Sequence, residues 1–115
     1  MTPGGQGQLS REILLTLWKI HILYHAGEGP VVGRWMLEEL RSHGYRISPG
    51  TLYPLLSRME KNGWLSSLVK GRGPKGRRDY HLTASGREVL CVVRAFIDEL
   101  HEELHEEPGH SGHSD

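Results

Sequence analysis

Positive charge in this sequence is concentrated between residues 41 and 78. The whole chain of 115 residues balances 14 Lys and Arg residues with 14 acids, but this stretch contains a single acid, Glu60. Its cations are Arg41, Arg46, Arg58, Lys61, Lys70, Arg72, Lys75, Arg77 and Arg78. A local cluster of cations in a chain of zero net charge is typical of a surface that binds a polyanion. The chemistry that these residues offer is the pairing of ammonium and guanidinium groups with phosphates.

The cations of this stretch fall into two groups. Arg58 and Lys61 lie on a predicted short helix, and the second group lies in a predicted hairpin that Gly and Pro interrupt. The hairpin cations are Lys70, Arg72, Lys75, Arg77 and Arg78. Cations so close together repel one another, and a bound polyanion relieves that repulsion. A helix followed by a basic hairpin is the arrangement with which a winged helix binds double-stranded DNA.

The short helix has one apolar face and one polar face. Apolar residues at helical spacing predict the buried face, namely Leu52, Leu55, Leu56 and Met59. The other residues are Thr51, Tyr53, Pro54, Ser57, Arg58 and Lys61, and Ser48, Pro49 and Gly50 precede them. Hydroxyls, one aromatic ring and two cations suit contacts with phosphates and base edges. We interpret this helix as a recognition helix, because an ordinary surface helix would not by itself explain an exposed Tyr53.

Two pairs of histidines have the spacing of metal ligands on a helix. His21 and His25 stand four residues apart, and so do His101 and His105. Each pair faces one direction and can chelate a transition metal. If the two helices meet across a dimer, the four imidazoles converge. The alternative is that these histidines are polar residues at the edge of an interface. Apart from this transition metal, the sequence indicates no cofactor.

Apolar spacing and turn residues predict four helices and one hairpin. The elements are helices over 10–27 and 31–44, the recognition helix from Ser48 or Thr51 to Gly63, strands over 64–69 and 78–82, and a last helix over 84–106. Ser10 and Thr83 have the side chains of N-caps. Gly44 permits a left-handed C-cap. The fold class is therefore α+β, mainly α.

The last helix is too long for the small domain before it to cover. At about 1.5 Å per residue it is on the order of 34 Å long. We expect its apolar seam, together with the first helix, to pack on a second copy of the chain. The expected interface residues are Leu14, Leu17, Trp18, Val93, Phe96, Ile97, Leu100 and Leu104. Trp18 and Phe96 also offer flat apolar surfaces for a small aromatic effector, although core packing is the better explanation for each residue taken singly.

Composition indicates a soluble protein of one domain. No apolar run approaches the roughly 18 residues that span a bilayer, and the start lacks the pattern of a signal peptide. We therefore expect a cytoplasmic protein without a membrane partner. Cys91, the single cysteine, lies in a helical apolar pattern and is expected to be a small buried side chain. No arrangement of catalytic residues is apparent, so we expect no enzyme activity.

The expected organisation has four parts. Residues 1–8 form a flexible tail, residues 9–83 a winged helix-turn-helix domain that binds DNA, residues 84–107 a dimerisation helix, and residues 108–115 a flexible tail rich in His, Gly and Ser.

Two motifs in this order of elements resemble the PadR-like transcriptional regulators, especially the short subgroup with one C-terminal helix. The first, Ser48-Pro-Gly-Thr-Leu-Tyr-Pro-Leu-Leu56 with Ser57-Arg-Met-Glu-Lys-Asn-Gly63, is similar to the recognition helix of that family. The second, Gly76-Arg-Arg-Asp-Tyr-His-Leu-Thr-Ala-Ser-Gly-Arg87, is similar to the second strand of its wing and the entry to its last helix. The likeness extends roughly over residues 13–104.

The resemblance implies a homodimeric winged helix-turn-helix repressor that a small ligand releases from its operator. One departure is Gly29-Pro-Val-Val-Gly-Arg34, which lacks the His and the Tyr that the family commonly has in this turn. Two alternatives remain open at this stage. The protein could be a metal-responsive repressor, or a winged-helix module whose basic face binds an acidic protein.

Overall fold

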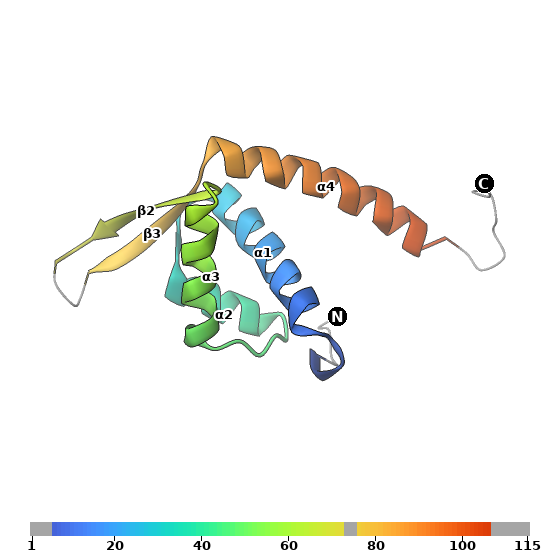
Figure 1. Ribbon diagram of the computed structural model, residues 1–115, viewed down its shortest axis with the longest axis horizontal. Coiled ribbons are helices and arrows are strands. Elements are labelled where there is room, and N and C mark those ends of the chain that lie inside the picture. Colours follow the sequence, from blue (N-terminus) through green and yellow to red (C-terminus); the bar gives the residue numbers. More distant parts are fainter. Residues whose placement is uncertain (1–5, 73–75, 107–115) are drawn as a thin grey trace.

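The computed structural model describes residues 6–72 and 76–106, which form four α-helices, a short 3₁₀ helix and a three-stranded sheet. The elements are η1 (Gln6–Gln8), α1 (Arg11–Glu28), β1 (Val31–Val32), α2 (Gly33–Ser42), α3 (Pro49–Lys61), β2 (Leu65–Lys70), β3 (Arg77–Leu82) and α4 (Ala84–Leu104). In Figure 1, α1, α2 and α3 form one group, the β2–β3 hairpin projects from it, and α4 extends in the other direction. The predicted α+β fold, mainly α, is confirmed.

Helices α1 and α4 begin at the N-cap residues that the sequence predicts. The Ser10 hydroxyl accepts a hydrogen bond from the amide three residues on at 3.2 Å, and the Thr83 hydroxyl does the same at the start of α4 at 2.9 Å. Ser48 is the N-cap of α3, with Pro49 in the first helical position, so the start at Thr51 was wrong. Gly44 follows α2 with a φ of 95°, a conformation that glycine adopts without strain.

The sheet has the strand order β1-β3-β2, and both pairings are antiparallel. Val31 pairs with Tyr80, and Val32 pairs with Asp79. The predicted start of the second helix at Val31 was therefore wrong. Two successive β-branched residues favour an extended backbone, and the free edge of β3 supplies their hydrogen-bond partners. The helix starts only at Gly33.

One apolar core joins the first three helices to the sheet. Its fully buried side chains include Ile22, Leu23, Met36, Leu40, Leu52, Leu55, Leu56, Met59 and Leu65. Leu14 and Trp18 belong to the same core, and Trp18 is only 3% exposed. Both residues were expected at a dimer interface. In the structure both side chains are instead buried in the core of their own chain, where the ring of Trp18 meets that of Tyr45, so neither presents its surface to a second subunit.

Most of α4 is exposed, since only Gly86 and Leu90 are buried among its residues. Its first turns pack against α1 and β3, and the rest extends beyond the core (Figure 1). Cys91 is exposed, which corrects the expectation of a buried side chain. It follows Leu90 by one residue and so points about 100° away from the buried face. Within residues 6–72 and 76–106, no helix has the length and apolar composition needed to cross a membrane.

The start of α4 fits closely against the end of α3, and this contact gives a stability prediction. A Cβ atom at Gly86 would collide with the carbonyl oxygen of Trp64 and approach Leu82 Cδ1 at 2.7 Å. We expect Gly86→Ala to lower the free energy of unfolding by about 1–3 kcal/mol, because the obstructing atom is backbone and cannot turn aside. Urea denaturation at fixed protein concentration measures the change. Ser85→Ala, at an exposed neighbour in the same helical turn, should leave the midpoint almost unchanged.

The N-terminal segment is partly anchored. The Gln6 side chain donates a hydrogen bond to the Arg46 carbonyl at 3.0 Å and accepts one from the Arg46 amide at 2.6 Å. Residues 6–8, expected to belong to a flexible tail, therefore form a defined element beside the segment that leads into α3. The remainder of that tail, residues 1–5, and the C-terminal tail, residues 108–115, lie outside the described residues.

Candidate nucleic-acid interface

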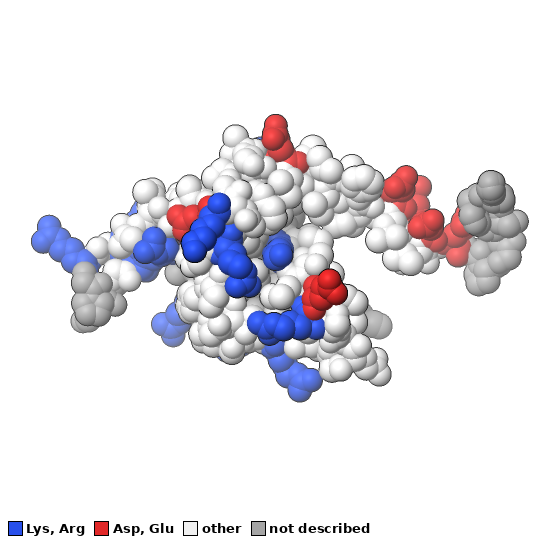
Figure 2. Space-filling view, in the orientation of Figure 1, with Lys and Arg blue, Asp and Glu red and all other residues white. Residues whose placement is uncertain are grey.

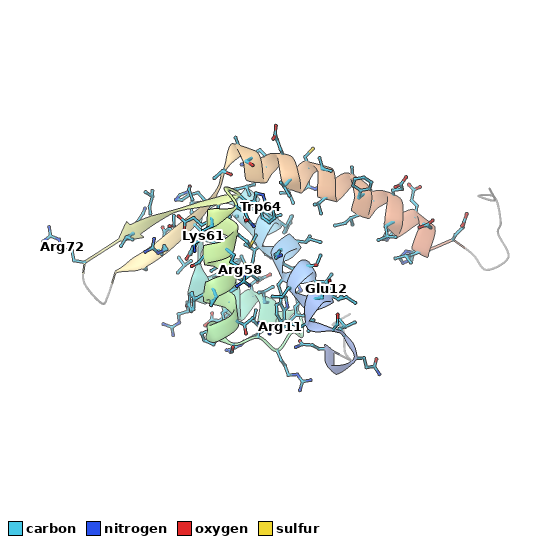
Figure 3. The ribbon with its side chains drawn as sticks, viewed as in Figure 1. Arg11, Glu12, Arg58, Lys61, Trp64 and Arg72 are labelled. Atoms are coloured by element: carbon cyan, nitrogen blue, oxygen red, sulfur yellow. The ribbon has the colours of Figure 1, made fainter. Side chains whose placement is uncertain are left out.

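Helix α3 buries one face and presents the predicted DNA-binding residues on the other. Ser48, Pro49, Gly50, Tyr53, Pro54, Ser57, Arg58 and Lys61 are exposed, and Thr51 is half-buried. Tyr53 is 42% exposed, as the sequence indicates. In Figure 3, Arg58 and Lys61 lie along α3, and Arg72 lies at the far end of the hairpin. The helix thus offers hydroxyl, aromatic and cationic groups on one surface.

The ring of Tyr53 packs against the first residue of α2. A Cβ atom at Gly33 would lie 2.5 Å from Tyr53 Cε1, so only glycine leaves room for the ring in this position. Gly33 itself is buried. The contact fixes one face of the ring and leaves the rest of the side chain exposed. The position of the Tyr53 ring is therefore restricted on one side by its own chain.

Two of the hairpin cations already have an acidic partner. Asp79 on β3 is buried, and its carboxylate lies 3.1 Å from Arg77 Nε and 3.8 Å from Lys70 Nζ. This acid stands one residue beyond the cationic stretch that the sequence marks out. The charge available for phosphates is therefore smaller than the count of cations suggests. Arg72 makes no ion pair with any residue in the described part of the chain, and Lys75 lies outside the described residues.

Arg78 connects the hairpin to α3. Its guanidinium donates a hydrogen bond to the Ser67 hydroxyl at 2.9 Å, and that hydroxyl donates to Glu60 Oε2 at 2.8 Å. Ser67 lies on β2 and Glu60 lies on α3, so the network fixes the hairpin relative to the helix. Sequence reasoning found Arg78 but not the two partners that orient it.

A hollow of about 510 Å³ lies between α3 and the hairpin. It is lined by Ser57, Glu60, Lys61, Arg78 and Tyr80. Three of these residues, Ser57, Lys61 and Arg78, are predicted DNA-binding residues that come from both the helix and the hairpin. Tyr80 is buried, and burial raises the pKa of its phenol. The ring therefore forms a neutral floor beneath the polar side chains.

Charge is separated along the molecule. In Figure 2, Lys and Arg residues gather over the hairpin and the helical group, whereas Asp and Glu residues gather toward the end of α4. The acids of that end are Asp98, Glu99, Glu102, Glu103 and Glu106, all exposed. A polyanion is attracted to the first region and repelled by the second.

The apolar seam of α4 faces a hollow of about 820 Å³ that α1 borders on the other side. The predicted seam residues Val93, Ile97 and Leu100 line it, with Leu17 from α1. Phe96 and Leu104 lie outside the hollow and are 66% and 71% exposed. Trp18, the expected partner of an aromatic effector, is in the core and does not line this space, so it cannot serve as a stacking surface here.

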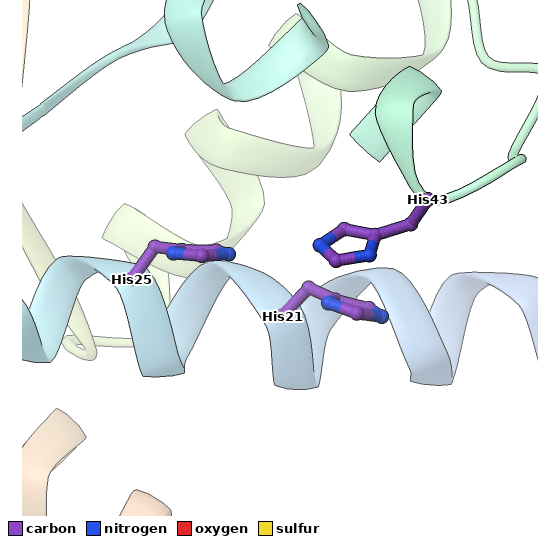
Figure 4. Close-up of side chains that lie close together, drawn as sticks. All are labelled: His21, His25 and His43. Carbon is purple, nitrogen blue, oxygen red and sulfur yellow. The ribbon is translucent and has the colours of Figure 1, made fainter. Parts of the chain in front are cut away.

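The structure groups the histidines differently from the sequence expectation. His21 and His25 on α1 lie beside His43, which follows the last turn of α2 (Figure 4). The pKa of His21 is lowered, mainly by burial and then by the neighbouring His43 and His25. His101 and His105 stack on each other with ring centroids 4.2 Å apart on the exposed part of α4. His43 was missed because its nearness to α1 depends on how two helices cross.

Three helices with a basic β-hairpin after the third define a winged helix-turn-helix, a class of DNA-binding protein. Comparison with known proteins gives the family. Residues 22–91 match the Transcriptional regulator PadR-like family, and the chain belongs to that family. The resemblance found in the sequence is thereby confirmed, and regulators of this family bind DNA.

Individual relatives agree with this assignment. The chain is 43% identical over 94 residues to the transcriptional regulator Rv3488 of Mycobacterium tuberculosis, covering 82% of this chain and 88% of that protein. The fold is similar to a PadR-like transcription factor from Bacteroides fragilis, with a TM-score of 0.72 and 26% identity over 81% of this chain and 91% of the other. A PadR family regulator from Eggerthella lenta has a TM-score of 0.64 and 31% identity over 84% and 92%.

Proposed function

We propose that this protein is a homodimeric repressor of transcription that binds a specific double-stranded DNA operator. The observation that carries the proposal is the convergence of Ser57 and Lys61 from α3 with Arg78 from the hairpin around one hollow. A phosphate that contacts Lys61 and Arg78 would meet both elements at once and fix α3 in register with the groove. Glu60 also lines the hollow, and its carboxylate accepts a hydrogen bond from the Ser67 hydroxyl. Tyr53, held against Gly33, is then placed to contact base edges. The family is one of transcriptional regulators, and we propose no catalytic role.

The dimer is supported by the exposed seam of α4. Phe96, Ile97, Leu100 and Leu104 are all more than 40% exposed on one side of a helix that its own chain leaves largely uncovered. A contiguous apolar surface of this kind marks an interaction site. A second copy that packs its own α4 and α1 against this seam would bury it. The resulting dimer would carry two recognition helices, one from each subunit.

Release by a small ligand is supported by the hollow between α1 and α4. Its lining is mainly apolar and includes Leu17, Ile20, Tyr24, Val93 and Ile97. A volume of about 820 Å³ accommodates a drug-sized molecule. A ligand held there would touch both helices that we assign to the dimer, and could shift the distance between the two recognition helices. A small aromatic effector would stack against Tyr24 rather than Trp18.

The test is binding to the DNA upstream of the protein's own gene, compared with random DNA of equal length. We expect wild type to prefer the upstream fragment and Tyr53→Ala to lose about 1–3 kcal/mol of that preference, since it removes a group placed to contact bases. Affinity for random DNA should change little. Fluorescence anisotropy at one stated salt concentration measures both affinities.

Two variants serve as controls for this measurement. Leu9→Ala removes a large apolar side chain of similar exposure, 39%, that belongs neither to α3 nor to the hollow between α1 and α4, and should keep the preference for the upstream fragment. Tyr53→Phe keeps the ring and isolates the hydroxyl. Equal losses of Tyr53→Ala on both fragments would show that this side chain does not read sequence. Absence of any preference in wild type, with binding to an acidic protein instead, would favour the interaction module.

A further inference from the structure

Three histidines converge on one side of α1. His21 and His25 project from α1, and His43 reaches toward them from the end of α2 (Figure 4). One ring nitrogen from each lies within 4.8 Å of the others. The rings of His21 and His43 are tilted by 32° with centroids 5.2 Å apart. Imidazoles from two separate helices therefore point into the same small space.

Glu39 adds a carboxylate to this group. Its Oε2 lies 3.4 Å from His25 Nε2 and 3.1 Å from His43 Nε2. Two ligands that are each about 2.1 Å from a tetrahedral ion lie about 3.4 Å apart. The distances from Glu39 Oε2 to the two imidazole nitrogens are thus close to the separation of neighbouring ligands in a zinc site. The side chain of Glu39 is partly buried, at 26% exposure, which limits competition from water.

We propose that His21, His25 and His43, with Glu39 as the fourth ligand, form a binding site for a divalent transition metal. Imidazole and carboxylate ligands suit zinc, nickel and copper better than magnesium or calcium, which take sets of oxygen ligands. Among these metals, zinc accepts a tetrahedral arrangement of four protein ligands without penalty. The site differs from the one that the sequence suggested, because it needs neither His101 nor His105.

Two further polar groups lie near ring nitrogens of these histidines. Glu28 Oε1 lies 3.7 Å from the other nitrogen of His25, Nδ1, so a carboxylate stands behind that ligand. The Tyr45 hydroxyl lies 3.3 Å from His21 Nε2 and restrains that ring. Groups of this kind fix the tautomer and orientation of ligating imidazoles, and replacing them typically weakens metal binding.

The position of the metal site connects it to DNA binding. This step rests on the proposed function. The metal would connect α1 to the end of α2, and α2 packs against the recognition helix α3. His21, His25 and His43 also line the hollow between α1 and α4. A metal ion at this place would therefore link the dimer helices to the orientation of the DNA-binding helices.

The test is calorimetric titration of zinc and nickel into the full chain, cleared of metal with a chelator and without DNA. Wild type is expected to bind one zinc ion per chain. His43→Ala should weaken binding by at least about 100-fold, since the loss of an outer-shell partner alone costs roughly 10- to 100-fold. Zinc at 100 times its Kd should raise the Tm of wild type by about 10 °C, and that of His43→Ala hardly at all.

Two further variants keep the result interpretable. The double variant His101→Ala, His105→Ala removes the other histidine pair and is expected to bind zinc like wild type. Glu39→Gln should bind about tenfold more weakly, which tests the site without removing an imidazole. His110 and His113 remain in every variant, so binding by them would appear equally in all. Equal affinity of wild type and His43→Ala, or loss confined to the His101 and His105 variant, would overturn the proposal.

The regulatory part has a separate readout. Zinc is expected to change the affinity of wild type for the upstream DNA fragment by at least about fivefold, the lower end of allosteric couplings, and to leave His43→Ala unaffected. Tight zinc binding with unchanged DNA affinity would overturn the coupling and keep the site. Failure to bind DNA with or without zinc would instead count against the proposed function, because the titration of zinc itself uses no DNA.

Discussion

The double variant Phe96→Glu, Leu100→Lys is expected to sediment as a monomer and to lose operator binding. Both side chains are exposed on α4, at 66% and 49%, so the substitutions should not disturb the core of the chain. In a dimer through this seam, they would replace apolar contacts with two buried charges. Their mutual attraction at i, i+4 is small compared with the cost of removing both from water, which amounts to several kcal/mol. The chain would remain folded but would present one recognition helix in place of two.

The size of the expected loss of operator affinity follows from the linkage of two DNA-binding domains in one dimer. Half-sites of a helix-turn-helix dimer lie roughly 34 Å apart on the duplex. When two DNA-binding domains are joined, the second binds its half-site in an intramolecular step, and the affinity exceeds that of one domain by about 10² to 10⁴. We expect the monomer to lose a factor of this order on the operator. Analytical ultracentrifugation and anisotropy on the same sample report both quantities.

A matched control moves the same pair of charges by one residue. Ala95→Glu with Glu99→Lys places Glu and Lys four residues apart in α4, rotated about 100° around the helix axis from Phe96 and Leu100. Ala95 and Glu99 are exposed. This variant should remain a dimer and bind the operator. If Phe96→Glu, Leu100→Lys is folded and still a dimer, the interface lies elsewhere.

The local features of the fold were predictable because they depend on residues close together in sequence. Ser10 and Thr83 reveal their helices by capping, and Leu52, Leu55 and Leu56 define the buried face of α3 by their spacing. The hairpin was predictable from glycines between two short strands. Each of these sequence patterns depends on a few neighbouring residues, so it can be recognised without knowledge of the tertiary structure.

The errors concern residues whose environment is set by distant parts of the chain. α1 is apolar on several sides, and spacing alone does not reveal which side faces the core, so Trp18 was assigned to the dimer. The two-residue strand β1 exists only because β3 offers it an edge. His43 joins the histidine pair of α1 through the crossing of α1 and α2. Asp79 pairs with Lys70 across the sheet, and only the tertiary structure shows that its carboxylate also meets Arg77 on the same strand.

The ion pairs of Asp79 sharpen the prediction for the hairpin, which we expect to supply phosphate affinity and little sequence information. Changing Arg72, Lys75 and Arg77 to Ala should weaken binding to operator and random DNA alike. Each lost phosphate contact lowers the slope of log K against log salt by about 0.9. Two full contacts and the partial contact of Arg77 in each of two subunits therefore give a reduction of between about 3.6 and about 5.4. Titrations at four or more salt concentrations measure the slope.

Single variants separate the free cation from the paired one. Arg72→Ala should lower the slope by about 0.9 per subunit, whereas Arg77→Ala should lower it less, because Arg77 lies 3.1 Å from Asp79 and is already partly neutralised.

Asp79→Asn keeps the size of the side chain and removes its charge. It frees Lys70 and Arg77, so affinity for all DNA should rise and the slope should steepen by up to about 1.8 per subunit. An unchanged slope in the triple variant would show that the hairpin does not contact DNA phosphates. An unchanged slope in Asp79→Asn would show that Lys70 and Arg77 do not reach phosphates.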